Sequence, residues 1–97
     1  MAVKYTKLFT ATDAIDLDPV TILVEYVSNG SGYRAVAIKT LGGEYDSPRE
    51  FEEALDTALE EADGDVVWNF IPLHLDGVKQ LIGALIGAVE AAEEDEA

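Results

Sequence analysis

The sequence predicts a small single α+β domain with a hairpin-containing sheet of three or four strands and two helices on one face, in the order β-β-β-α-β-α. Three features predict it: an alternating β-branched segment that leads into an Asn-Gly turn, a capped amphipathic helix, and a second long helix near the C-terminus. The 97 residues, 48% of them hydrophobic, suffice for one core. We therefore expect one domain over residues 1–92, followed by a solvated acidic tail at residues 93–97.

The N-terminal half contains three strand patterns. Residues 3–9 alternate apolar and polar side chains and predict a short, half-buried strand, and residues 11–18 then read as a loop. Residues 20–27 and 33–41 predict a β-hairpin, because the intervening Asn29-Gly30 supplies the positive φ that a tight turn requires.

The two faces of this hairpin differ in composition. One face is strongly apolar and predicts a core, formed by Val20, Ile22, Val24, Tyr26, Val36 and Ile38. The other is mixed, and it consists of Thr21, Leu23, Glu25, Val27, Tyr33, Ala35, Ala37, Lys39 and Leu41. Because the mixed face is too apolar for a water-facing surface, we interpret it as a candidate contact surface.

The segment that follows the hairpin has the signals of a helix start. Ser47 is a typical N-cap, Pro48 occupies the first helical position, and Glu50 completes a capping box. The helix is expected to continue to about Ala62. Its apolar residues recur at helical spacing and predict the side that packs on the sheet, namely Phe51, Ala54, Leu55, Ala58, Leu59 and Ala62.

The C-terminal segment predicts a strand and a helix. Residues 66–75 are apolar and β-branched, which favours a fourth strand that bends at Pro72 and places Trp68 in the core. Asp76 is a plausible N-cap for a helix over residues 77–92. That helix has an apolar stripe of Val78, Leu81, Ile82, Leu85, Ile86 and Val89. Residues 71–92 are similar to the Ala- and Leu-rich ends of many small bacterial and phage proteins, which implies no functional residue.

The opposite side of this last helix is made of small residues. Gly83 and Gly87 each cost helix stability relative to alanine, and their spacing of four residues allows another backbone to approach closely. Two interpretations stay open. Gly83 and Gly87 contact a second copy or a partner helix, or this side packs within the monomer, for instance against the first helix.

The net charge of −14 comes entirely from residues 44–97. Four acidic and four basic residues balance in residues 1–43, whereas the other sixteen acidic residues face only Arg49 and Lys79. Such a field attracts basic partners and repels nucleic acids and anionic membranes. We therefore expect no direct binding to nucleic acid or to membranes.

The first helix concentrates this charge on its solvent side. Glu53, Asp56 and Glu60 form one line, and Glu50, Glu52 and Glu61 flank it. Like charges at this spacing slightly destabilise a helix, so the pattern calls for another explanation. Three explanations stay open: the acidic side binds a basic protein surface as a nucleic-acid mimic, it keeps the protein soluble, or it is a halophilic adaptation. The candidate binding residues are Glu50, Glu53, Asp56, Glu60 and Glu61.

The sequence offers little evidence for a catalytic or metal-binding motif. The chain contains no cysteine and one histidine, so disulfides and a structural zinc site are not expected, and His74 reads as a strand-end residue bonded to backbone. Asp13, Asp16 and Asp18 do not match an EF-hand. Residues 80–89, the longest charge-free apolar stretch, reach about half of a membrane span. With no secretory signal expected at the N-terminus, we predict a cytoplasmic protein without metal or cofactor.

These observations favour binding over catalysis. The leading hypothesis is a small acidic, non-enzymatic interaction module, with a basic protein surface as its partner and inhibition of a nucleic-acid-binding target as one mode of action. The alternative is a structural or assembly subunit, cellular or viral, that forms homo-oligomers through Gly83, Gly87 and the exposed sheet face. In that case the acidity serves solubility.

Overall fold

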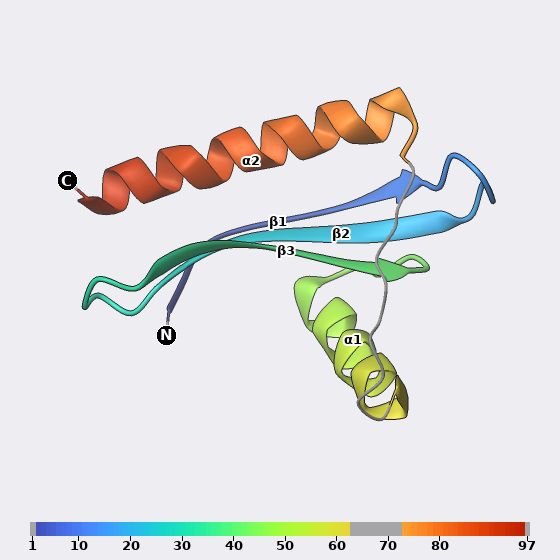
Figure 1. Ribbon diagram of the computed structural model, residues 1–97, viewed down its shortest axis with the longest axis horizontal. Helices are drawn as coiled ribbons and strands as arrows, with labels where there is room; N and C mark the ends of the chain where they lie inside the picture. Colours follow the sequence, from blue (N-terminus) through green and yellow to red (C-terminus); the bar gives the residue numbers. More distant parts are fainter. Residues whose placement is uncertain (1, 63–72, 97) are drawn as a thin grey trace.

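The computed structural model describes residues 2–62 and 73–96 (Figure 1). Its elements follow the order β1 (Ala2–Thr12), β2 (Pro19–Ser28), β3 (Arg34–Gly42), α1 (Pro48–Ala62) and α2 (Leu75–Glu96). The strands form an antiparallel meander in the order β1-β2-β3. The predicted α+β class is therefore confirmed.

The predicted fourth strand lies mostly outside the described residues, as do Trp68 and Pro72. At its end, Leu73 forms an isolated antiparallel bridge with Asp13. The final helix begins at Leu75, two residues earlier than predicted. Asp76 therefore lies in the first turn and is not the N-cap. It still favours the helix start, because a carboxylate near a helix N-terminus interacts well with the helix dipole.

The hairpin of β2 and β3 is confirmed, with a five-residue loop over residues 29–33. The side-chain oxygen of Asn29 accepts hydrogen bonds from the backbone N–H groups of Ser31 (2.8 Å) and Tyr33 (3.1 Å). Gly30 and Gly32 adopt φ values of 74° and 101°, which side chains other than glycine rarely tolerate. Asn29 and the two glycines thus fix the loop locally.

Strand β1 is longer than the sequence predicts. It continues through Ala11, which is paired with Val20 and buried, so the predicted loop starts only at Asp13. The Asp13 carboxylate accepts hydrogen bonds from the N–H groups of Ile15 (2.8 Å) and Asp16 (3.0 Å). Local turn bonding of this kind is a common role of aspartate.

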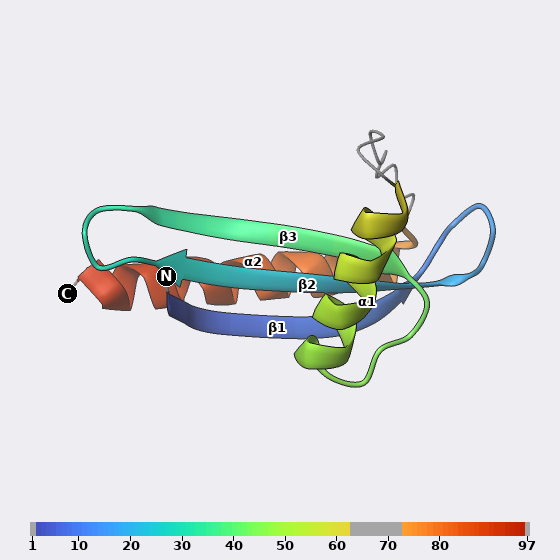
Figure 2. The same cartoon turned by 90° about the horizontal axis from the view of Figure 1, so that it is seen from below.

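The two helices lie on opposite faces of the sheet, not on one face as predicted (Figures 1 and 2). The chain changes face directly after β3, where Gly43 adopts a φ of 107°. The Thr21 hydroxyl donates to the Gly43 carbonyl at 2.8 Å. Thr21 points away from the face that carries Ile22, because successive side chains of a strand alternate. The Thr21–Gly43 bond therefore holds Gly43 on the second face, where the following helix lies.

Helix α1 has the predicted bounds and a modified cap. The Ser47 hydroxyl accepts the N–H of Glu50 at 3.2 Å, as expected of an N-cap. The Glu50 carboxylate accepts the N–H of Asp46 at 3.2 Å, one residue earlier than in a standard capping box. Phe51 is fully buried, whereas Leu59 is half-exposed. The predicted packing stripe is therefore buried at its start and open at Leu59.

Candidate interaction surfaces

Helix α2 lies along β1 and β2 (Figure 1). Its small residues Gly77, Ala84 and Ala88 face the sheet, whereas Gly83 is exposed. Ala84 and Ala88 are buried in one core cluster with Ile22, Val24 and Tyr26. A side chain on Gly77 would meet the Cβ of Ala11 at 2.9 Å. The small residues thus allow the helix backbone to approach the strands closely.

The Tyr5 ring fills the space beside this helix. Its hydroxyl donates a hydrogen bond to the Ala84 carbonyl at 3.0 Å. A Cβ on Gly87 would lie 2.8 Å from Cζ of Tyr5, whereas a Cβ on Gly83 would meet nothing within 4 Å. The structure thus gives Gly87 the intramolecular packing role that the sequence left open, although the neighbour is the sheet and not α1. Partner binding by Gly83 and Gly87 stays a prediction.

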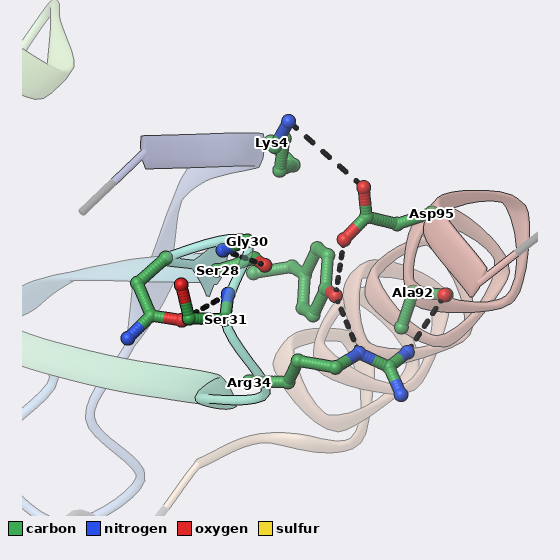
Figure 3. A network of polar contacts seen from close by, with 9 residues as sticks. Lys4, Ser28, Gly30, Ser31, Arg34, Ala92 and Asp95 are labelled. Carbon is green, nitrogen blue, oxygen red and sulfur yellow. Dashed lines mark hydrogen bonds and ion pairs between the residues drawn. The ribbon is translucent and has the colours of Figure 1, made fainter.

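A polar network holds the C-terminal end of α2 on the sheet (Figure 3). The Tyr26 hydroxyl donates to the Asp95 carboxylate at 2.8 Å, and Lys4 lies 3.9 Å from the same side chain. Arg34 donates through Nε to the Tyr26 hydroxyl at 2.9 Å and through a terminal nitrogen to the Ala92 carbonyl at 2.8 Å. A cation near the last carbonyls of a helix also interacts favourably with the helix dipole. The end of α2 is therefore held by both charge and hydrogen bonds.

With its small residues on the sheet, α2 turns its large apolar residues toward solvent. Ile82, Ile86 and Val89 are 52%, 54% and 51% exposed. With Leu85, they line a shallow groove that ends at Glu90 and Glu93. The apolar stripe of this helix is thus largely an outer surface, except for the half-buried Leu81 and Leu85.

Strand β3 adds exposed apolar residues on the same face of the sheet. Val36 and Ile38 pair with Tyr26 and Val24, so they lie on the face that carries α2. The sequence places them in the core, but they are exposed, because α2 covers β1 and β2 and leaves β3 open. We define the α2–β3 apolar surface as Val36, Ile38, Val78, Ile82, Ile86 and Val89.

The segment of α2 that contributes to this surface contains few charged residues. From Gly77 to Val89 the only charged residue is Lys79, and acidic residues resume at Glu90. No ion pair within the described residues uses Lys79 or Glu90. A chain with a net charge of −14 therefore keeps acidic residues off three turns of its exposed apolar helix.

The acidic side of α1 lies on the opposite face of the sheet. Glu50, Glu53, Asp56, Glu60 and Glu61 are all exposed. Glu53 forms an exposed ion pair with Arg49 at 3.2 Å, of the kind that contributes little to stability. The other predicted binding residues, Gly83 and Gly87, belong to α2. The structure therefore divides the candidate residues between two separate surfaces.

Lys39 ties α1 to the sheet. Its ammonium lies 2.7 Å from the Glu52 carboxylate and 2.9 Å from that of Glu25, which is 10% exposed. Burial acts to lower the pKa of Lys39, but the hydrogen bonds and charges of Glu52 and Glu25 outweigh burial, so its pKa lies above the ordinary value of 10.5. The mixed sheet face predicted as a contact surface is thus covered by α1 at this point, where Thr21 and Leu23 are fully buried.

His74 is exposed, and its backbone N–H approaches the Thr12 carbonyl at 3.5 Å, a weak contact at the end of the bridge with β1. Among residues 2–62 and 73–96, no three His, Asp or Glu side chains converge in a way that could hold a metal ion. In the same ranges, neither helix is long and apolar enough to cross a membrane.

Sequence reasoning recognised the apolar stripe of α2 but not that it faces solvent. The available signal was the line of small residues at Gly77, Ala84 and Ala88, which fits close packing on a strand surface. Comparison with protein-family models, with curated proteins and with solved structures finds no match for this chain.

Proposed function

We propose that this protein is a non-enzymatic assembly subunit whose copies associate through the α2–β3 apolar surface. The observation that supports it is the exposure of Ile82, Ile86 and Val89 along a helix stretch without acidic residues. Contiguous apolar patches of this kind are typical of protein–protein contacts. The proposal assigns no substrate or cofactor and includes a cytoplasmic location.

The exposed fractions set the expected strength of association. Covering the exposed half of one of these aliphatic side chains contributes about 1 kcal/mol. Four residues of the surface are at least half-exposed, namely Ile38, Ile82, Ile86 and Val89. On two copies they contribute about 8 kcal/mol, which corresponds to a Kd of about 1 µM before the entropic cost of association is subtracted. We therefore expect a reversible dimer with a Kd above about 1 µM.

Sedimentation across protein concentrations of about 1 µM to about 1 mM tests the proposal. Ile82→Asp should abolish association, because it places a charge in the apolar surface. Leu59→Asp is a matched control, since Leu59 is 51% exposed and lies on α1. A wild-type protein that stays monomeric throughout, or equal effects of the two substitutions, would refute the proposal.

The acidic side of α1 supports a second candidate function, binding to a basic protein surface. Lys39 and the buried Phe51 fix the first turns of α1, so Glu53, Asp56 and Glu60 project from an anchored helix. Neutralising these three residues should slow association with a basic partner and speed its dissociation, whereas neutralising Glu44 and Glu94, which are exposed and lie outside α1, should change association alone. Equal effects confined to association would leave the acidic side as a solubility feature.

A further inference from the structure

We infer that the two copies pair through antiparallel α2 helices related by a two-fold axis near position 84, with Lys79 of each copy beside Glu90 of the other. This inference rests on the proposed function and specifies how its surface is used. It depends on the pattern of exposed residues along α2, on the placement of its charges and on the exposed apolar area.

The exposed residues of α2 repeat symmetrically about the middle of the helix. Val78 and Val89 are eleven residues apart, as are Lys79 and Glu90, and eleven residues make about three turns with a residual rotation of only about 20°. The members of each pair therefore lie on nearly the same line of the helix surface. A two-fold axis near position 84 places Val78 beside the other copy's Val89 and Ile82 beside its Ile86.

The same axis brings opposite charges together. In an antiparallel pair, the same side of the apolar stripe on each helix meets. Lys79 of one copy therefore faces Glu90 of the other, and the two-fold axis repeats this contact a second time in the dimer. Within one copy, Lys79 and Glu90 are about 16 Å apart along the helix and cannot pair. Glu93 of each copy is also placed near the start of the other copy's helix, where a carboxylate is favoured by the helix dipole. Parallel pairing would instead bring opposite sides of the stripe together, so Lys79 and Glu90 would not face each other.

The exposed apolar area is adequate for a dimer. Leu75 is 76% exposed, and with the α2–β3 apolar surface it provides roughly 500 Å² of exposed apolar area per copy. An interface of standard size buries about 800 Å² on each partner, and about two thirds of that area is apolar in homodimers. A second copy therefore matches the extent of this surface.

Cysteine cross-linking tests the orientation, because the chain has no cysteine of its own. Val78→Cys and Val89→Cys proteins should form a disulfide-linked heterodimer when mixed and oxidised, and neither should cross-link efficiently by itself. Leu59→Cys, on the other face of the sheet, is the control and should give no linked dimer. Efficient self-linking of Val78→Cys would overturn the inference, since it indicates parallel helices.

Charge reversal tests the pairing of Lys79 with Glu90. Lys79→Glu and Glu90→Lys should each weaken the dimer about tenfold at low ionic strength, because each converts two attractions into two repulsions. The double variant Lys79→Glu/Glu90→Lys should recover wild-type affinity. Dimers that tolerate both single changes, or that the double change does not restore, would overturn the pairing.

The outcomes separate this inference from the proposed function. Association that Ile82→Asp abolishes, combined with no linkage between Val78→Cys and Val89→Cys, would refute the antiparallel arrangement and leave the assembly function standing. A monomeric wild-type protein would refute both.

Discussion

Replacing Gly83 and Gly87 with alanine, one at a time, should change the stability of the fold in opposite directions. Both glycines lie inside α2, four residues apart, and each substitution adds a single methyl group. A methyl group on Gly83 meets nothing within 4 Å. On Gly87 it lies 2.8 Å from Cζ and 2.9 Å from Cε2 of Tyr5, closer than van der Waals contact allows.

The magnitudes follow from helix propensity and packing. Alanine favours a helix interior over glycine by about 1 kcal/mol, and Gly83→Ala should realise all of this gain. In Gly87→Ala the Tyr5 ring must move away, at a packing cost of about 1 kcal/mol or more. Its hydrogen bond to the Ala84 carbonyl is then lost, which costs about 1 kcal/mol further. We expect Gly87→Ala to be destabilised by about 1 kcal/mol, roughly 2 kcal/mol less stable than Gly83→Ala.

Urea and thermal unfolding at one fixed protein concentration measure this difference, since self-association also shifts apparent stability. For a chain of this length the melting temperatures of the two variants should differ by roughly 10 °C. Adding Tyr5→Phe to Gly87→Ala removes the hydroxyl group nearest the new methyl group and should recover part of the loss. If Gly87→Ala stabilises the protein as much as Gly83→Ala, the packing of Tyr5 on α2 is wrong.

Two further predictions concern Lys39. Lys39→Met should lower the free energy of unfolding in urea by about 2 kcal/mol, because it leaves the buried Glu25 carboxylate without its cation, and adding Glu25→Gln should restore part of the loss. Because the pKa of Lys39 is raised in the fold, its stabilising contribution is complete below 10.5 and is lost as pH rises through the folded-state pKa. The stability gap between wild type and Lys39→Met should therefore stay constant up to about pH 10 and narrow above 10.5, and a gap that does not narrow there would contradict this explanation.

The features that sequence reasoning predicted well are those with local causes. Ser47 and Pro48 define a helix start within one turn, and the structure places α1 at the predicted bounds. The Asn29-Gly30 pair defines a loop within a few residues, and the hairpin forms around it. Side chains a few residues apart determine such features, so no knowledge of the rest of the fold is needed.

The features that sequence reasoning predicted wrongly depend on contacts between residues that are far apart in the chain. Periodicity shows that α2 is amphipathic, but it does not show which side the sheet accepts. Here the Tyr5 and Tyr26 side chains occupy space above the strands, and only small residues such as Ala84 and Ala88 fit against them. On the other face, α1 is held by contacts distant in the chain, such as the ion pair between Lys39 and Glu52, and the turn before it is held by the bond between Thr21 and Gly43, which lie 22 residues apart in sequence.

The two candidate surfaces are arranged so that one can be occupied without covering the other. The acidic residues of α1 and the α2–β3 apolar surface lie on opposite faces of the sheet (Figure 1). Two packed layers of about 10 Å each therefore separate them. This separation exceeds the screening length of about 8 Å at physiological salt, so the acids of α1 repel a second copy at α2 only weakly. The proposed pairing through α2 would leave α1 of both copies exposed to the proposed basic partner. The segregation of charge from apolar area along this chain would make the two proposed kinds of binding compatible.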